Sequence, residues 1–238
     1  MANWIYIKNQ SIGHVYIWEY NEGGGWWQPS SVTLLYLPLN STNTYTDQSG
    51  KNIGTTNTGT IFWTYQWVDC GYFDGYSHIQ VNPFAQTLPL TVLVWTYSTW
   101  DVRDYERDWK IYDARDGNSY FLMVYGIEWW TGYFAQANGY ASSRQNIPNQ
   151  WVLNVMRITS TGLRHNEYNL NGTGSGSSSV GSISSFTPTY INIWNERDNW
   201  ANRFFIWWIS ELIVENKERS DSEIEDYFDV TKANYSWN

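Results

Sequence analysis

Short apolar runs separated by polar turn residues make up most of this 238-residue chain. Three of them, 90–97, 120–125 and 150–158, are apolar at most positions, which is typical of strands covered on both faces. The other predicted strands are 32–37, 60–63, 72–73, 78–81, 190–194 and 204–215. Many short strands at such intervals predict a sandwich or a barrel of β-sheets.

Only the last segment has the pattern of a helix. Ser220 and Glu223 have the spacing of a capping box, in which the serine hydroxyl accepts from the backbone N–H of the glutamate and the carboxylate reaches back. Ile224 and Phe228 are four residues apart and share one face of such a helix. The sequence therefore predicts one short helix near 221–232 that packs this face against the sandwich.

The first thirty residues have the pattern of a separate unit. Two strand-like runs, 4–8 and 14–20, predict a β-hairpin, and because an isolated hairpin is only marginally stable we expect it to dock on the body or on a partner. The Gly- and Ser-rich stretch 172–185 reads as a flexible loop within one sheet. The chain is thus expected to divide into an attachment segment, 1–31, and a main domain, 32–238.

Composition points to an interior built from flat rings. Aromatic residues make up 19% of the chain, including 17 Trp and 19 Tyr. Such side chains favour pleated surfaces and exposed binding faces. This composition excludes a Leu- and Ala-rich helical bundle and a disordered chain.

The net charge and the cysteine content limit which binding partners and which cellular compartment are expected. The formal net charge is −9 with no basic cluster, so neither nucleic acid nor an anionic membrane surface is an expected partner. Only 16% of residues are charged, so the surface is expected to be largely neutral and hydrogen-bonding. Such a surface suits binding of carbohydrate or contact between protein copies, and it is equally compatible with a β-sheet surface that binds nothing. The lone Cys70 excludes an internal disulfide and is expected to be a small buried side chain. With no signal peptide or membrane span evident, we expect synthesis in a cytoplasm and no membrane insertion.

Four stretches together resemble laminin-G-like, concanavalin A-like jelly-roll domains. Each is weak alone, but they occur in the family's order. They are 35–40 with the loop 47–50, the hairpin 70–81, the strand 150–155 with the turn 168–172, and the closing strand, turn and helix 209–224. This resemblance implies an all-β fold: an antiparallel two-sheet jelly-roll sandwich over 32–238, with an N-terminal hairpin and one short C-terminal helix.

A strand pair ahead of such a jelly roll also resembles an arrangement in bacteriophage and phage-like virion proteins. Those proteins act as fibres, head decorations or receptor binders. In this interpretation residues 1–31 attach the chain to the particle. Five aromatic residues are the expected contacts of this attachment segment. They are Tyr6, Tyr16, Trp18, Trp26 and Trp27.

Glycoside hydrolysis is a hypothesis that the resemblance raises, because laminarinase-type enzymes share this jelly roll. The best carboxylate pair, Glu211 and Glu215, would lie roughly 13 Å apart on one face of a strand. Retaining and inverting enzymes need about 5–9.5 Å. The sequence also lacks a nucleophile elbow and zinc-ligand spacing. We therefore expect no catalytic residues and no catalytic activity.

Two kinds of binding site remain as hypotheses. Loop carboxylates at Asp101 and Asp104 suggest a calcium site, and calcium is the one cofactor that the sequence indicates. Arg103 and Arg107 interleave with these carboxylates, which favours the alternative that the charges pair with one another at a solvent-exposed edge. Glycan contact would use aromatic faces beside polar loop residues, although core packing competes for every ring. The candidate glycan-binding residues are Trp129, Trp130, Trp194 and Trp200.

These observations favour a non-enzymatic structural protein of a phage or phage-like virion, with an adhesive, glycan-binding role. Its expected partners are other virion proteins, copies of itself in a homo-oligomer, and a host-surface glycan. Its expected location is the virion, after synthesis in the host cytoplasm. A cellular lectin or carbohydrate-binding module is the first alternative, and a glycoside hydrolase is the second.

Overall fold

The computed structural model describes residues 3–8, 15–20, 28–42, 45–74, 77–98, 109–127, 130–138, 140–143, 149–171, 174–196 and 207–236. Regular structure in these ranges is almost entirely β-strand, with one α-helix, α1 (Asp221–Thr231), followed by a single 3-10 turn, η2 (Lys232–Asn234). Within these residues, no helix has both the length and the apolar character that crossing a membrane requires.

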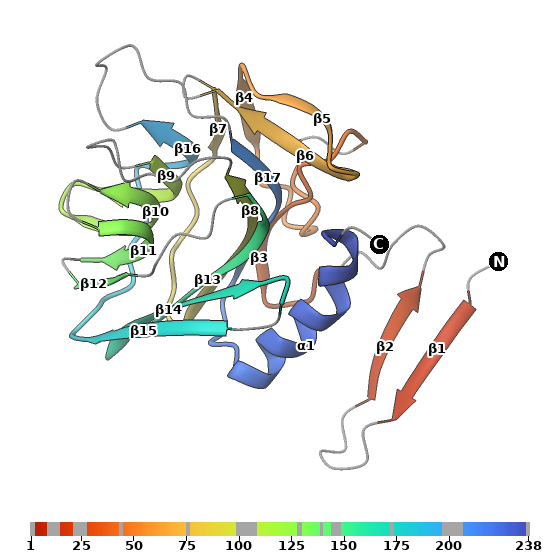
Figure 1. Ribbon diagram of the computed structural model, residues 1–238. Coiled ribbons are helices and arrows are strands. Elements are labelled where there is room, and N and C mark those ends of the chain that lie inside the picture. The colour runs from red at the N-terminus through yellow and green to blue at the C-terminus, as the bar shows by residue number, and fades with distance from the viewer. Residues whose placement is uncertain are drawn as a thin grey trace.

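Two antiparallel sheets pack face to face as a sandwich (Figure 1). The first sheet has seven strands, in the order β12, β11, β10, β9, β16, β7 and β4. Their bounds are β4 (Thr55–Thr58), β7 (His78–Val81), β9 (Trp109–Asp116), β10 (Ser119–Ile127), β11 (Trp130–Ala137), β12 (Tyr140–Ser143) and β16 (Tyr190–Glu196).

The second sheet has eight strands, in the order β15, β14, β13, β8, β17, β6 and β5, with β3 beside the end of β17. Their bounds are β3 (Thr33–Leu37), β5 (Ile61–Tyr65), β6 (Val68–Phe73), β8 (Leu90–Ser98), β13 (Trp151–Thr159), β14 (Gly162–Asn169), β15 (Gly174–Val180) and β17 (Trp207–Glu215). The fold is the two-sheet jelly-roll sandwich that the sequence predicts.

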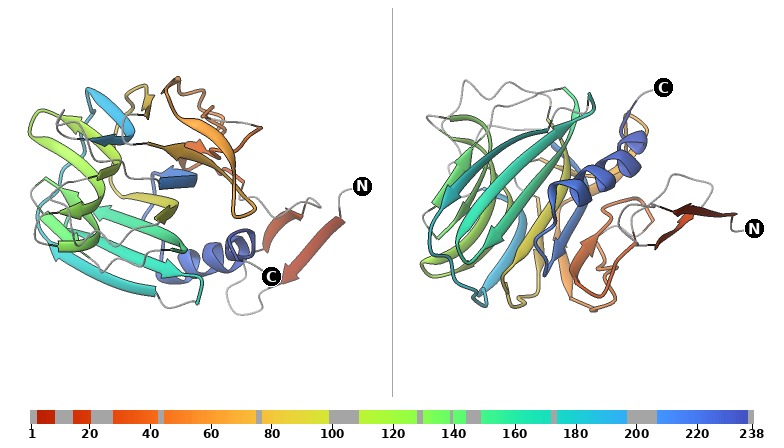
Figure 2. Two further views of the ribbon diagram at one scale, coloured as in Figure 1. Left: turned by 45° about the horizontal axis from the view of Figure 1, so that its top comes forward. Right: turned by 90° about the horizontal axis from the view of Figure 1, so that it is seen from below.

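Both faces of the eight-stranded sheet are covered at its centre. On β8, Val92 and Val94 belong to the apolar core between the sheets. Leu93 and Trp95 belong to a second core, on the outer side, which includes Phe228 of α1. Figure 2 shows α1 lying along that outer side. This double cover explains why 90–97 is apolar at nearly every position.

The predicted helix is confirmed, including its cap. Ser220 Oγ accepts from the backbone N–H of Glu223 at 3.2 Å, and the Glu223 carboxylate accepts from the backbone N–H of Ser220 at 2.9 Å. Ile224 and Phe228 are buried against the sheet. The helix therefore begins where its local sequence specifies and docks through the predicted face.

The N-terminal hairpin is also present. Strands β1 (Asn3–Lys8) and β2 (Val15–Tyr20) pair antiparallel in a two-stranded sheet of their own, from Asn3 opposite Tyr20 to Lys8 opposite Val15. The division of the chain at residue 31 and the attachment role of this segment stay predictions.

The Gly- and Ser-rich stretch is not only a loop, because 174–180 forms the edge strand β15 beside β14. A Cβ atom at Gly176 would lie 2.4 Å from Asn166 Nδ2, so a larger residue there would require the Asn166 side chain to move. Composition alone indicates flexibility here, whereas backbone pairing with β14 imposes an extended chain. The sequence pattern also gave no separate strand prediction for β4, β9, β11, β12 and β14.

Candidate functional site

A continuous row of aromatic rings crosses the outer face of the eight-stranded sheet. Most of these rings are on neighbouring strands, and two come from the C-terminal segment, Phe228 in α1 and Tyr235 after η2. Consecutive centroids along the row lie between 3.7 and 5.9 Å apart. Aromatic pairs at such distances contribute about 0.5–1.5 kcal/mol each beyond simple burial. In spatial order, the aromatic row consists of Trp63, Tyr72, Trp208, Tyr65, Tyr97, Trp151, Tyr235, Trp95, Phe228 and Tyr168.

One end of the aromatic row is buried beneath the C-terminal segment. Trp95 of β8 is fully buried, and it stacks on Tyr235 at 4.0 Å and on Phe228 at 5.7 Å. Tyr235 also donates from its hydroxyl to Ser210 Oγ at 3.1 Å. These rings act as core, because α1 and the residues after it exclude water from them.

The other end of the row is exposed on the hairpin formed by β5 and β6. Ile61 and Trp63 of β5 are 59% and 49% exposed, and Trp67 in the turn is 80% exposed. A tryptophan is seldom left so open, because its ring is the largest apolar side chain. We call Ile61, Trp63 and Trp67 the exposed platform.

The turn that carries Trp67 is held in place by the sheet below it. Gln66 and Trp67 both have positive φ angles, 47° and 67°, as in the tight turn that fits the twist of a two-residue hairpin. Gln66 Nε2 donates to the Tyr97 hydroxyl at 3.0 Å. Tyr65 stacks face to face on Trp208, with centroids 3.7 Å apart and planes at 11°. The platform therefore rests on a buried support.

Charge on this hairpin is confined to its opposite face. Asp69 of β6 pairs in register with Thr64 of β5, and its carboxylate accepts from the Thr64 hydroxyl at 2.6 Å and the Ser41 hydroxyl at 2.9 Å. Trp63 and Cys70 form the neighbouring register pair, on the platform side. Burial raises the pKa of the Cys70 thiol to about 12, which agrees with its expected role as a small apolar side chain.

The candidate hydrolytic carboxylates share one face of β17, as the sequence predicts, but that face is covered by α1. Glu211 is 1% exposed and accepts from the Tyr227 hydroxyl of α1 at 2.7 Å. Burial raises the pKa of Glu211 to about 7, against the opposing effect of hydrogen bonds from Tyr227 and Tyr36. Glu211 thus fastens the helix to the sheet.

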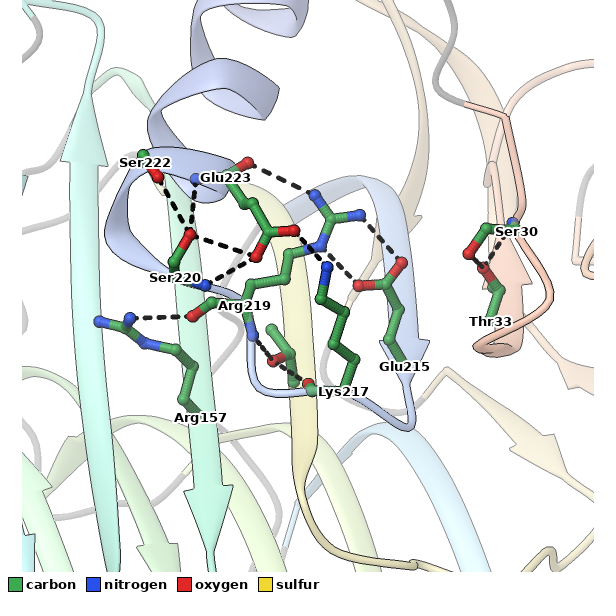
Figure 3. Close-up of polar contacts among 10 residues, drawn as sticks. Ser30, Thr33, Arg157, Glu215, Lys217, Arg219, Ser220, Ser222 and Glu223 are labelled. Carbon is green, nitrogen blue, oxygen red and sulfur yellow. Dashed lines mark hydrogen bonds and ion pairs between the residues drawn. The ribbon is translucent and has the colours of Figure 1, made fainter. Parts of the chain in front are cut away.

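Glu215 is engaged at the turn between β17 and α1 (Figure 3). Arg219 donates to both of its carboxylate oxygens, from Nε at 2.5 Å and from Nη2 at 2.9 Å. Lys217 forms an ion pair with Glu223, and Arg157 donates to the carbonyl oxygen of Arg219 at 3.0 Å. These contacts fix the direction in which the chain enters the helix.

Most of the site residues predicted from the sequence lie outside the described residues. This applies to Trp129, Trp200, Asp101, Asp104, Trp26 and Trp27. The remaining candidates lie in strands, but their side chains are outside the description. They are Tyr6 in β1, Tyr16 and Trp18 in β2, Trp130 in β11 and Trp194 in β16. The glycan, calcium and attachment residues therefore stay predictions.

In the part of the chain that the structure describes, no three His, Cys, Asp or Glu side chains come together in a group that could hold a metal ion. The loop with Asp101 and Asp104 is outside that part, so the calcium hypothesis rests on the sequence alone.

Sequence reasoning missed the exposed platform. No glycine, proline or asparagine occurs between Ile61 and Cys70 to mark the turn at Gln66 and Trp67, and the sequence pattern predicts strands only at 60–63 and 72–73. The exposure of these side chains follows from the position of β5 at the edge of its sheet. That position cannot be read from the sequence. On an edge strand, the outward face has fewer neighbours to bury it.

Comparisons with known proteins give a fold and no family. No family model matches the chain, and no curated protein matches it. Solved structures do. The binding domain of botulinum neurotoxin serotype C1 matches 83% of this chain at 14% identity with a TM-score of 0.63, and that of serotype G matches 82% at 12% identity with a TM-score of 0.61. The chain spans about half the length of both.

A third match is similar in size to this chain. Domain 4 of AbnA, an extracellular arabinanase of Geobacillus stearothermophilus solved in complex with arabinotriose, has 14% identity and a TM-score of 0.61. The match covers 82% of this chain and 97% of that one. At such identities these neighbours establish the β-sandwich fold and nothing further.

Proposed function

We propose that this protein binds a glycan on the exposed platform of the β5–β6 hairpin. The observation that carries the proposal is Trp67, 80% exposed at the tip of a turn that Gln66 and Tyr65 hold against buried rings. A rigid aromatic face in water offers apolar area to the carbon-bearing face of a sugar ring at little cost in conformational entropy.

The known neighbours support this choice among binding functions. The arabinanase domain was solved with arabinotriose, and cell entry of botulinum neurotoxin type C depends on interaction with two ganglioside molecules. Both ligands contain sugars, and both proteins share the fold of this chain. The candidate carboxylates for hydrolysis are buried and already bonded, Glu211 to Tyr227 of α1 and Glu215 to Arg219 just before α1, so the proposal assigns the chain no catalytic step.

Replacing Trp67 with alanine should weaken glycan binding about tenfold or more, since truncating an aromatic anchor removes over about 1.4 kcal/mol of binding free energy. Thermal stability should change little, because the ring is mostly in water. The measurement is a screen on a glycan array followed by titration calorimetry with the strongest ligand. Val180→Ala is the matched control, since Val180 is 85% exposed on β15, at the opposite edge of the same sheet.

Absence of binding to every glycan on the array would contradict the proposal. Equal binding by the Trp67→Ala protein and the wild type would move the site elsewhere, and Trp129, Trp130, Trp194 and Trp200 would then be the next residues to replace.

The biological setting that we propose is a virion of a phage or phage-like particle, where the chain is assembled in the host cytoplasm with other virion proteins and copies of itself. The sequence supports this setting through its single cysteine, its weakly charged surface and its N-terminal hairpin. A cellular lectin or carbohydrate-binding module is the alternative with the same binding chemistry.

Deletion of residues 1–31 separates these two settings. We expect the shortened chain to keep its glycan affinity and to lose its oligomeric state and its incorporation into particles. The readouts are light scattering and co-purification with the assembly. A shortened chain that still assembles would favour the lectin.

A further inference from the structure

We infer that the glycan on the exposed platform is a neutral chain and not a sialylated, anionic one. This inference rests on the proposed function and names the class of ligand. Proteins of similar fold bind ligands of both classes, because gangliosides carry sialic acid whereas arabinotriose has no charge.

A sialic acid or uronic acid is recognised through its carboxylate. Proteins bind carboxylates with Arg or Lys side chains, whose charge-assisted hydrogen bonds are about twice as strong as neutral ones. The stretch from Thr55 to Phe73, which contains the platform, has no Lys or Arg. Its one charged residue is Asp69, a carboxylate on the opposite face of the hairpin that is already bonded to Thr64 and Ser41.

Cations elsewhere in the described residues are already engaged. Among the Lys and Arg residues whose side chains the structure describes, each except Lys51 forms an ion pair with a carboxylate. The pairs are Lys110 and Arg115 with Asp113, Arg157 and Arg164 with Asp221, Lys217 with Glu223, Arg219 with Glu215, and Lys232 with Asp229. Recruiting one of them to a sugar carboxylate would leave its own partner unpaired.

Lys51, the remaining cation among these described side chains, lies away from the platform. Lys51 Nζ donates to the carbonyl oxygen of Ser31, just before β3. Strand β3 pairs with β17 at Leu212–Glu215, whereas β6 pairs with β17 at Trp207–Ile209. At about 3.3 Å per residue, some 20 Å of strand separates Glu215, opposite Thr33, from Ile209. The platform therefore lies in an uncharged to acidic part of the described surface.

The shape of the platform favours a chain over a single terminal sugar. Ile61 and Trp63 are two residues apart on one face of β5, a spacing of roughly 7 Å along the strand, and Trp67 follows in the turn. Because β5 is the edge strand, Ile61 and Trp63 lie along the sheet edge, and Trp67 lies in the turn at its end. A linear glycan laid parallel to β5 meets all three, and each contact is apolar.

The test uses the full chain and four probes. They are arabinotriose, linear arabinan, a ganglioside oligosaccharide, and the same oligosaccharide after removal of its sialic acid. Binding is titrated by calorimetry at low and at high salt, with wild-type protein, Trp63→Ala, Trp67→Ala and the Val180→Ala control.

We expect the neutral linear chain to bind, with an affinity that salt changes less than twofold and that Trp67→Ala lowers about tenfold. The sialylated oligosaccharide should bind at least about tenfold more weakly than its desialylated form, because no cation among the described side chains around the platform receives its carboxylate. Val180→Ala should match the wild type with every probe.

A sialylated probe that binds more tightly than its neutral counterpart, and loses affinity at high salt, would overturn this inference and leave the proposed function standing. Failure of all four probes and of the glycan array would remove both. Binding of the neutral probes that is insensitive to Trp63→Ala and Trp67→Ala would also overturn the inference, since the platform would then not be the site.

Discussion

Arg219→Ala is expected to destabilise the protein by about 3–5 kcal/mol, among the largest effects of any single change outside the apolar core. Arg219 is the bidentate partner of Glu215, a carboxylate that is only 1% exposed. Its removal leaves a buried charge without compensation and also takes away a guanidinium 5.7 Å from the ring centre of Tyr227. Urea unfolding followed by tryptophan fluorescence measures the loss.

Two further variants show whether the uncompensated charge is the cause. Glu215→Gln in the Arg219→Ala background should recover part of the lost stability, because it neutralises the stranded carboxylate. Arg164→Ala is the matched control: its ion pair with Asp221 is 3.5 Å long and about half exposed on both sides, so its loss should cost about 0–1 kcal/mol. An Arg219→Ala effect no larger than that of the control would refute the argument.

The contribution of Glu211 to the free energy of unfolding should increase as the solution is acidified from pH 8 to pH 5. Burial raises its pKa to about 7 in the folded chain, above its ordinary value of 4.5. The folded state therefore holds this proton more tightly than the unfolded state. The resulting contribution is complete below about pH 4.5 and is lost as the pH rises to about 7, a change of up to about 3 kcal/mol.

Glu211→Gln isolates this contribution, because the amide can still accept from the Tyr227 hydroxyl but does not titrate. The difference in unfolding free energy between wild type and variant should shift by about 2–3 kcal/mol between pH 5 and pH 8, in favour of the wild type at pH 5. Asp221 and Glu223, whose pKa values are lowered in the folded chain, act in the opposite direction and cancel in this difference. Val230→Ala, on the exposed side of α1, is the control, because it removes no titratable group.

The groups around Glu211 explain why one carboxylate has this effect. Tyr227 and Tyr36 donate to it, Tyr235 lies nearby, and Arg219 is the neighbouring cation. Arg219 is bonded to Glu215, so it lowers the pKa of Glu211 less than burial raises it. A parallel pH response of wild type and Glu211→Gln would mean that another group dominates.

Local sequence determined the helix and the general class of the fold. Ser220 and Glu223 close their hydrogen bonds within one turn, so the helix start needs no distant partner. The doubly apolar run 90–97 required cover on both faces, and two cores supply it. Such features are readable because their physical cause lies within a few residues of the chain.

Tertiary structure decided which residues are exposed and which are joined. Trp63 and Trp95 are both aromatic residues on strands, yet one is half exposed and the other fully buried, because β5 is an edge strand and β8 is central under α1. Glu211 reads as a candidate catalytic carboxylate until Tyr227, sixteen residues away, covers it. Exposure and pairing across a sheet depend on strand order, and strand order is set by contacts between residues far apart in the chain.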